Sequence, residues 1–343
     1  MSVTIKPLDD ASAAAWDAFV ESRPDGTFFH RAPWAPLIEK AFGFRTFYCY
    51  AERDGCIVGV LPLVQVKTLL FGNALTSTPF CVYGGPLAAD TETYAALAAY
   101  AAALLPKTGA SVVEFRHRDD VDSDWIDRPD LYVTFRKAIA ADHEQNLKAI
   151  PRKQRAMVRK GIQNGLTSVV EHDPGRLHRI YAESVRNLGT PVFSTKFFQL
   201  LMRTFAGCAD IVTIMHGETA VASVMNFYFR DEVLPYYGGG TMAARPVAAN
   251  DFMYWEVMRR AADRGYRLFD FGRSKLGTGA YAFKHNWGFE AAKLRYSYCL
   301  APGASIPDHN PLNPKYALFI AAWKRLPLPV ANLLGPPIVR GLG

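Results

Sequence analysis

Residues 211–229 read IVTIMHGETAVASVMNFYF, two runs rich in β-formers around a turn at His216-Gly217. Valine, isoleucine, phenylalanine and tyrosine favour strands, and a short glycine-containing turn between two such runs favours a hairpin. Residues 47–66, FYCYAERDGCIVGVLPLVQV, repeat this pattern around an Asp-Gly turn. The sequence therefore predicts one antiparallel hairpin in each half of the chain.

Each hairpin is followed by an aromatic residue and two glycines, then by a predicted helix and a short strand. The first set is Tyr83-Gly84-Gly85, a helix over 91–105 and a strand over 112–116; the second is Tyr237-Gly238-Gly239, a helix over 250–264 and a strand over 267–271. The second helix is predicted to be capped by Asn250 or Asp251 and to end at Gly265. Two copies of a β-β-β-α-β unit indicate an α+β fold with mixed, mainly antiparallel sheets flanked by helices.

The length of 343 residues exceeds what one hydrophobic core usually supports, so we expect two domains and a tail. The predicted boundaries are 1–141, 142–302 and 303–343, with the probable active site in the second domain. In the tail, residues 315–325 predict a last helix that packs back on the body. The prolines that follow exclude one long helix.

Composition favours a cytoplasmic protein with an anionic partner. The net charge is +7, and the five cysteines form no CxxC pair that would indicate a disulfide framework or a zinc site. The N-terminus lacks a secretory pattern, and no apolar run reaches the length of a membrane span. Hydrolase, metalloprotease, kinase and dehydrogenase motifs are absent from the sequence, and no metal is expected.

A glycine-rich stretch follows the last predicted core strand, FDFGRSKLGTGAYAFKHNWGF over 269–289. Glycines allow a ligand to approach the backbone closely, and the stretch holds Arg273, Lys275 and Lys284. A fixed cation would stabilise the negative charge that grows on a carbonyl oxygen under attack by an amine. The alternatives are a solvated lysine and, for Arg273, an ion pair with an acid such as Asp270.

Residues 148–160, KAIPRKQRAMVRK, hold six basic residues and no acidic one. Helical spacing places Arg152, Arg155 and Arg159 along one face, with Lys160 beside them. The run could bind phosphates of tRNA or of a diphosphate-linked acceptor, or it could be a solvated charged face.

Four stretches carry a resemblance that extends over nearly the whole chain from residue 29 onward. They are FHRAPWAPLIEKAFG (29–43), PRKQRAMVRKGIQNGL (151–166), the glycine-rich stretch 269–289 and NPLNPKYALFIAAWKRLPLPVANLLGP (310–336). The chain resembles FemAB-related proteins associated with the PEP-CTERM/exosortase system. That resemblance implies two tandem GNAT-like domains. It also implies transfer of an aminoacyl group, in FemAB proteins from aminoacyl-tRNA, to an amine of a cell-envelope or exopolysaccharide-linked acceptor.

The resemblance also implies roles for particular residues. Phe283 and Lys284 match a Phe-Lys pair beside the reacting ester, which makes them the catalytic candidates, and Tyr281 joins Arg273 and Lys275 as a candidate for substrate binding. Arg31 and Trp34 match an acceptor groove in the first domain, although Trp34 as a core anchor and Arg31 as an exposed arginine fit equally. Tyr83 and Tyr237 are candidates for lining the two clefts, with core packing as the alternative.

The donor is left open between aminoacyl-tRNA and acyl-CoA, and no tightly bound cofactor is expected. Acetyl-CoA enzymes of the GNAT class place an R/Q-x-x-G-x-G/A loop at a helix N-terminus. Residues 238–251 read GGGTMAARPVAAND instead, which favours the FemAB-type donor. The alternatives are an acyl-CoA- or acyl-carrier-dependent N-acyltransferase and a non-catalytic binding protein. No general base is assigned, and Asp270 and Glu256 are interpreted as structural acids. The tail could contact a membrane peripherally, and no DNA partner is expected.

Overall fold

The computed structural model describes residues 3–119, 121, 124–129, 131–306 and 316–342. The chain forms two compact units that exchange segments. The first contains Met1–Tyr132, Lys293–His309 and Arg340–Gly343, and the second contains Val133–Ala292 and Asn310–Val339. The predicted boundaries follow the chain in order, whereas here strand β18 (Arg295–Leu300) returns to pair with β8 (Val112–His117) of the first unit.

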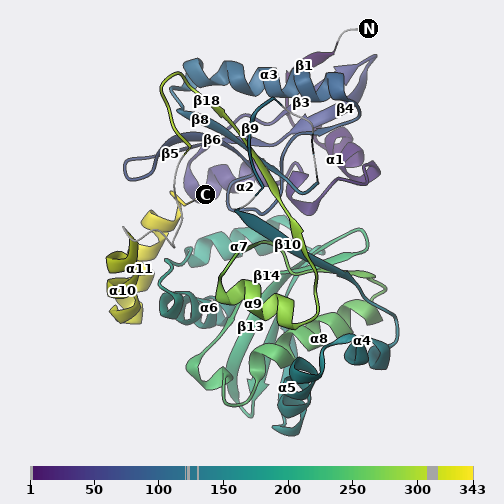
Figure 1. Cartoon of the computed structure of the whole chain (residues 1–343), viewed down its shortest axis with the longest axis vertical. Helices are drawn as coiled ribbons and strands as arrows, with labels where there is room; N and C mark the ends of the chain where they lie inside the picture. The colour runs from purple at the N-terminus through teal and green to yellow at the C-terminus, as the bar shows by residue number, and fades with distance from the viewer. Residues whose placement is uncertain (1–2, 120, 122–123, 130, 307–315, 343) are drawn as a thin grey trace. The chain divides into compact units, whose positions relative to one another are not determined.

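The first unit combines two sheets with helices, as Figure 1 shows. In the part of the chain that is described, one sheet has the order β1-β3-β4-β7 and the other β2-β5-β6-β8-β18-β9. The remaining strands are β1 (Thr4–Pro7), β2 (Arg45–Thr46), β3 (Cys49–Arg53), β4 (Cys56–Leu61), β5 (Leu63–Thr68), β6 (Gly72–Ser77), β7 (Leu87–Ala88) and β9 (Ile126–Arg128). The helices are α1 (Ala13–Ser22), η1 (Phe28–His30), α2 (Trp34–Phe42) and α3 (Thr91–Thr108).

The predicted hairpin of the first half is confirmed as β3 and β4. Arg53 pairs with Cys56, so the turn consists of Asp54 and Gly55 alone. Both turn residues have positive φ, 53° and 77°, the conformation that an Asp-Gly hairpin turn requires. Tyr237 lies in strand β14, whereas Tyr83 lies in no strand. Both halves therefore have the predicted helix and strands, but their aromatic-Gly-Gly segments differ in conformation.

An aromatic cluster anchors the core of the first unit. Trp34 is completely buried, its indole N–H donates to the carbonyl of Phe28 at 3.1 Å, and its ring packs against Phe28 and Phe29. We expect Trp34→Ala to lower the free energy of unfolding of this unit by about 3–5 kcal/mol, because it leaves a large cavity and an unpaired carbonyl. Urea denaturation followed by circular dichroism measures this change. Leu69→Ala, at a fully exposed leucine, should change the free energy of unfolding by less than about 0.5 kcal/mol. Equal losses in the two variants would contradict the role of Trp34 as a core residue.

Two buried histidines are expected to make the stability of the first unit depend on pH. His30 accepts from the Thr27 amide at Nδ1 and donates from Nε2 to the Gly85 carbonyl, which fixes a neutral ring. Burial lowers the pKa of His30 to about 4 and that of His117 to about 3. Between pH 6.5 and 4 the unfolded chain therefore binds more protons than the folded one.

Stability should consequently rise with pH across this window, by about 1.4 kcal/mol per pH unit for each histidine. Urea midpoints measured from pH 4 to 6.5 test this expectation. The variant H117Q should have a shallower slope than the wild type, whereas H216Q, at an exposed histidine, should keep the wild-type slope. Identical slopes for all three proteins would exclude the histidines as the cause.

The second unit is built on one sheet, which in the described residues has the order β11-β12-β13-β14-β15-β10-β16, with β17 also paired to β10. Its strands are β10 (Tyr132–Ala138), β11 (Thr167–Glu171), β12 (Ala209–His216), β13 (Thr219–Phe229), β14 (Glu232–Gly240), β15 (Leu268–Asp270), β16 (Ser274–Lys275) and β17 (Ala291–Lys293). Its helices are α4 (His143–Ala149), α5 (Arg152–Gln163), α6 (Gly175–Leu188), α7 (Thr195–Thr204), η2 (Met242–Ala244), α8 (Ala249–Asp263), α9 (Gly279–Asn286), α10 (Ala317–Arg325) and α11 (Leu328–Val339).

The hairpin predicted over 211–229 is confirmed as β12 and β13, although His216 pairs with Thr219 and the turn lies one residue later than predicted. The predicted cap of α8 is wrong. Asn250 and Asp251 lie inside its first turn, and the N-cap is Ala248 in a left-handed conformation without a side-chain hydrogen bond. Gly265, with φ of 89°, follows the helix as predicted.

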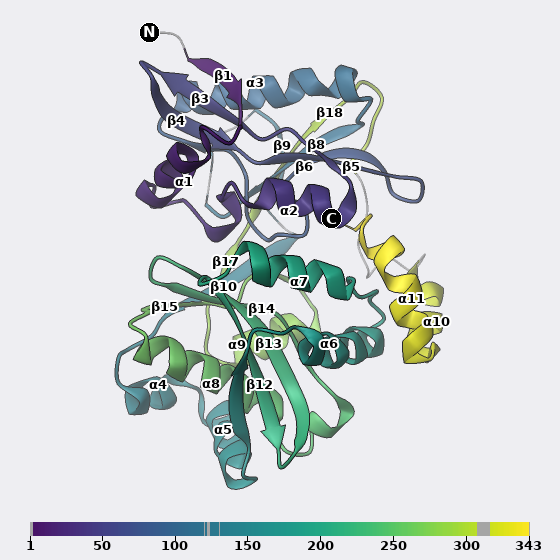
Figure 2. The ribbon, with the colours of Figure 1, turned by 180° about the vertical axis from the view of Figure 1, so that it is seen from behind.

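The tail forms two helices that pack on α6, as Figures 1 and 2 show. Trp323 of α10 is buried, and the Arg186 side chain donates to the carbonyls of Lys324 and Leu326 between the helices. Residues 328–339 form one continuous helix although they contain Pro336 and Pro337. The prolines therefore interrupt the helical structure of this stretch less than the sequence predicted. Lys315, the first residue of the predicted last helix, lies outside the described residues.

Candidate functional site

The sheet of the second unit opens between β14 and β15. These parallel strands pair only at Glu232–Leu268 and Val233–Phe269, although β14 continues to Gly240. β14 carries a bulge at Tyr236, between the pairs Asn226–Pro235 and Met225–Tyr237, and Pro235 beside it has no amide hydrogen to donate. The two strands part beyond their short pairing, at the carboxyl end of β15.

Lys284 lies directly at this end of β15. Helix α9 carries it and is capped by Thr278, whose hydroxyl accepts from the Tyr281 amide. The Lys284 ammonium donates to the carbonyls of Gly272 and Arg273, at 3.0 and 2.9 Å. It also lies 5.8 Å from the ring centre of Phe135 in β10. The turn after β15 and the distant strand β10 thus hold one cation in place.

Burial lowers the pKa of Lys284 to about 7, the nearby Asp270 opposes this change, and Arg273 adds to it. Asp270 is itself fully buried. One of its oxygens accepts from the Gly272 amide at 2.6 Å, and the other lies 3.3 Å from the Arg136 guanidinium. Asp270 therefore shapes the turn whose carbonyls hold Lys284 and places a negative charge beside it. Asp270 thus forms an ion pair with Arg136, and the ion pair between Arg273 and Asp270 stays a prediction.

Phe283 and Tyr281 flank the lysine on the same helix. Phe283 is partly buried against Tyr254 and Trp287, at ring distances of 5.5 and 6.1 Å. Tyr281 packs edge-on against Phe135 and stacks on His285. Both aromatic residues fix the position of α9 over the core.

Arg273 and Lys275 lie beside Lys284 on the segment that follows β15, and both side chains are partly buried. Lys275 belongs to β16, and its carbonyl accepts from the Thr278 hydroxyl. The structure therefore gathers the candidates from 269–289 in one region, while their role in substrate binding stays a prediction.

The other predicted groove residues pack in cores. Tyr237 is 5% exposed and contacts an aromatic cluster from α6, the segment after it and α7: Tyr181, Phe193, Phe197 and Phe198. Tyr83 is 1% exposed and packs against Phe29 in the first unit. Arg31 is partly buried and forms an ion pair with Asp17 at 3.5 Å. These contacts, with those of Trp34, are structural, and a role in ligand binding stays a prediction for all four residues.

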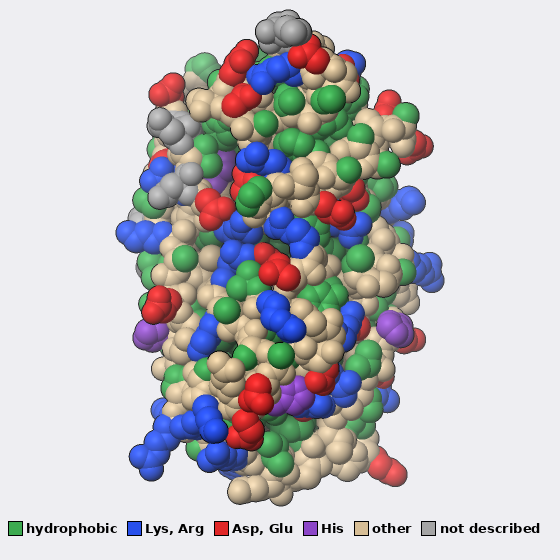
Figure 3. All heavy atoms as spheres, turned by 90° about the vertical axis from the view of Figure 1, so that its right-hand side faces the viewer, with side chains coloured by type: hydrophobic (Ala, Val, Ile, Leu, Met, Phe, Trp, Pro, Cys, Tyr) green, Lys and Arg blue, Asp and Glu red, His purple; other side chains and the backbone are tan. Residues whose placement is uncertain are grey.

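Helix α5 presents the predicted basic face. Arg152, Arg159 and Lys160 are exposed, and Arg155 is partly buried, where it donates to the Lys148 carbonyl. None of these cations forms an ion pair with another residue of the described chain. Figure 3 shows lysine and arginine side chains spread over its face, with one group near the middle and another at the lower left, and Figure 1 places α5 toward the lower end of the chain's second unit.

The position of α5 depends on a close contact with α8. A Cβ on Gly161 would lie 2.7 Å from the Cβ of Phe252, so only glycine permits this approach. Val158 and Gly161 are buried on the face toward α8, which leaves the basic residues on the outer faces. The charged helix is therefore anchored rather than loosely attached.

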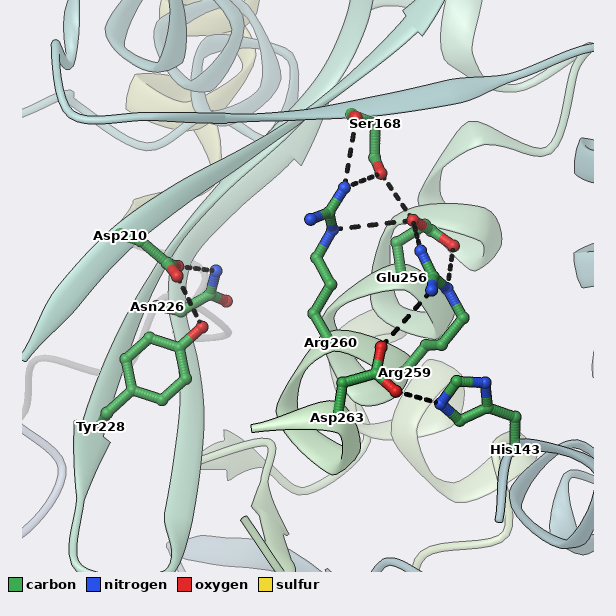
Figure 4. Close-up of polar contacts among 9 residues, drawn as sticks. All are labelled: His143, Ser168, Asp210, Asn226, Tyr228, Glu256, Arg259, Arg260 and Asp263. Carbon is green, nitrogen blue, oxygen red and sulfur yellow. Dashed lines mark hydrogen bonds and ion pairs between the residues drawn. The ribbon is translucent and has the colours of Figure 1, made fainter. Parts of the chain in front are cut away.

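The acids that we considered as structural are engaged in networks. Figure 4 shows Glu256 between Arg259, Arg260 and Ser168, whose hydroxyl donates to the carboxylate at 2.5 Å. Burial alone would raise the pKa of Glu256, but hydrogen bonds from Arg259 and Ser168 outweigh it and lower the pKa. Asp263 extends this network from Arg259 to His143. A carboxylate held in this way is poorly suited to accept a proton.

A second buried network at the start of β12 was not predicted. Asp210 accepts from Asn226 and from the Tyr228 hydroxyl, at 2.9 and 2.8 Å, and forms an ion pair with Arg264. Figure 4 shows it as separate from the Glu256 network. Its members lie up to 54 residues apart in the sequence, and no local motif predicted that they would be in contact.

Comparison with known proteins identifies the type of domain in the second unit. Residues 148–285 match the family model described as an acetyltransferase (GNAT) domain. The chain carries a GNAT acyltransferase domain. This domain contains Lys284 and the strands β14 and β15, which part beside it. Among curated proteins, no sequence matches the chain.

Solved structures extend the likeness beyond the GNAT domain. FemX aligns over 87% of this chain and 97% of its own, with a TM-score of 0.67 and 14% identity. A tandem GNAT protein from the clavulanic acid biosynthesis pathway covers 89% of this chain and 100% of its own, with a TM-score of 0.56 and 14% identity. The C-terminal domain of a putative lysylphosphatidylglycerol synthetase from Agrobacterium fabrum covers 84% and 91%, with a TM-score of 0.54 and 12% identity. The predicted GNAT-like α+β fold is confirmed.

No group of histidine, cysteine, aspartate and glutamate residues in the described part of the chain is arranged to hold a metal ion. None of the helices in the described ranges is both long and apolar enough to cross a bilayer.

Proposed function

We propose that the protein is a FemAB-like N-acyltransferase that moves an aminoacyl or acyl group from an activated donor to a primary amine. The observation that carries the proposal is the ammonium of Lys284, fixed at the carboxyl end of β15 where β14 and β15 part. The likeness to FemX over most of both chains supports the same assignment.

In this proposal the amine nitrogen attacks the carbonyl carbon of an ester or thioester. The carbonyl oxygen becomes negative, the bond to the leaving oxygen or sulfur then breaks, and the amine loses a proton as the amide forms. Protonated Lys284 stabilises the oxyanion, and Phe283 packs beside the reacting group. Positioning of the two substrates supplies much of the rate enhancement, and the base that takes the proton is left unassigned.

Aminoacyl-tRNA is our preferred donor. The four cations of α5 assigned to phosphate binding, Arg152, Arg155, Arg159 and Lys160, have no acidic partner in the described chain, and such a face suits a nucleic acid backbone. Arg273, Lys275 and Tyr281 would then contact the reacting end of the substrates.

An acyl-CoA donor is the second candidate, and two observations favour it. The family model that matches residues 148–285 is that of an acetyltransferase domain. In addition, the N-cap of α8 is Ala248, which has no side chain that could accept a hydrogen bond, and this leaves first-turn amides for other acceptors such as phosphate oxygens.

The acceptor in our proposal is an amine of a cell-envelope or exopolysaccharide-linked precursor, small or lipid-linked. We place the reaction in the cytoplasm, at the inner face of the membrane. The five cysteines are all free thiols, which supports a reducing compartment.

A thermal-shift comparison tests the proposal. The protein is heated with charged tRNA, uncharged tRNA, acetyl-CoA or a long-chain acyl-CoA, at low and moderate salt. We expect charged tRNA to raise Tm more than uncharged tRNA at moderate salt, because a donor site recognises the aminoacyl ester as well as the phosphates. A shift with CoA compounds alone would move the assignment to the second candidate, and no shift with any donor would contradict both.

A further inference from the structure

The tail helices α10 and α11 expose an apolar surface. Trp323 of α10 and Ala331, Gly335 and Val339 of α11 are buried. The buried positions of α11 follow a spacing of four residues, so one stripe of this helix faces the body. A Cβ on Gly335 would lie 2.8 Å from the Val192 carbonyl, which shows how closely α11 is seated.

The opposite stripe is also apolar, which is unusual for a helix on a protein surface. In α11 the exposed residues are Pro329, Val330, Leu333, Leu334 and Pro337, and the last four have a spacing of three and four residues. Leu333 is 76% exposed. In α10, Leu318 is 85% exposed and Phe319 42%. Both helices therefore bury one stripe against the second unit and offer another to the surroundings.

The apolar surface continues from the tail onto α6. Leu188, at the end of α6, is 69% exposed. It precedes Gly189, where a Cβ would lie 2.5 Å from Ile320 of α10. The surface formed by Leu188, Leu318, Phe319, Val330, Leu333 and Leu334 is called the tail surface below.

The charges of the segment favour one occupant. Residues 316–342 contain three basic residues, Lys324, Arg325 and Arg340, and no aspartate or glutamate. Lys324 and Arg325 are exposed at the end of α10, beside the connection to α11, where Arg186 of α6 also lies. Apolar side chains with flanking cations and no acids match a bilayer surface with anionic headgroups. Two copies of this surface would instead bring like charges together.

We propose that the tail surface binds the surface of an anionic lipid bilayer, with the leucines inserted among the lipids and Lys324 and Arg325 at the headgroups. The helices lie on the membrane and do not cross it, because each is far shorter than a spanning helix. This binding requires neither donor nor acceptor, so it stands independently of the proposed reaction.

The test is flotation of the full-length chain with vesicles of phosphatidylcholine alone or with 30% phosphatidylglycerol, at about 0.1 M and 0.5 M salt. We expect the wild type to bind the anionic vesicles. The double variant L318E/L333E should bind them at least about tenfold more weakly. The control is L69E/L70E, which makes the same change at two exposed leucines of the first unit. It should bind like the wild type.

A second variant keeps the proposal testable if L318E/L333E fails to fold. K324Q/R325Q keeps the apolar stripe and should lose most of the preference for anionic over neutral vesicles, about tenfold in partition. Absence of wild-type binding, or equal binding by wild type and L318E/L333E, would overturn the proposal. So would sedimentation showing a wild-type dimer that L318E/L333E abolishes, since a second copy would then cover the surface.

Discussion

Lys284→Met is expected to lower kcat/KM for acyl transfer by about two to three orders of magnitude, because the oxyanion loses its fixed cation. Methionine has a similar length and can occupy the position beside Phe135 without a charge. Removal of the ammonium leaves the carbonyls of Gly272 and Arg273 without this donor. The measurement is release of the acyl group from the donor in the presence of amine, with the donor chosen by the thermal-shift comparison.

The matched control is Lys196→Met, at an exposed lysine of α7 in the same unit. It should keep wild-type kinetics, and both variants should keep a cooperative thermal transition. Full activity of Lys284→Met in a folded protein would remove the central residue from the account.

Reversal of charge on α5 is expected to have the second large effect. The triple variant R152E/R159E/K160E should bind tRNA at least about a hundredfold more weakly at moderate salt, because three cations are replaced by three anions. The slope of log Kd against log salt should also fall in magnitude by about 2–3, since fewer counterions are released on binding. Fluorescence anisotropy of labelled tRNA across a salt series measures both quantities.

The matched control reverses three exposed lysines of the first unit, K40E/K67E/K107E, and changes the net charge equally. A general effect of net charge would weaken tRNA binding in both variants alike. That outcome, or unchanged binding by the α5 variant, would contradict a phosphate site on this helix.

Local signals predicted much of the fold. The Asp-Gly turn and alternating β-formers were sufficient for β3–β4, and the apolar strand followed by glycines located the segment that holds Lys284. The same signals failed where partners are distant. Phe135 and Arg136 of β10 reach the site through sheet pairing across more than 130 residues, which no local pattern encodes.

Burial was equally hard to predict from local sequence. For Tyr83 and Tyr237, which each adjoin a glycine pair, the sequence left cleft lining and core packing both open; each packs in a core, because of aromatic neighbours from other segments. The return of β18 to the first unit also depends on pairing with β8, about 180 residues earlier in the chain. Helix α11 formed despite Pro336 and Pro337, since its packing on α6 stabilises a helix that propensity alone disfavours.

The central claim is that this protein forms an amide by transfer at Lys284, and mass spectrometry of the acceptor tests it most directly. The protein is incubated with its stabilising donor and an envelope-precursor amine, and the acceptor is then weighed. The account predicts an acceptor heavier by the acyl group with the wild type, and formation slower by about two to three orders of magnitude with Lys284→Met. Donor binding with no acylated acceptor, or equal product from both proteins, would contradict it.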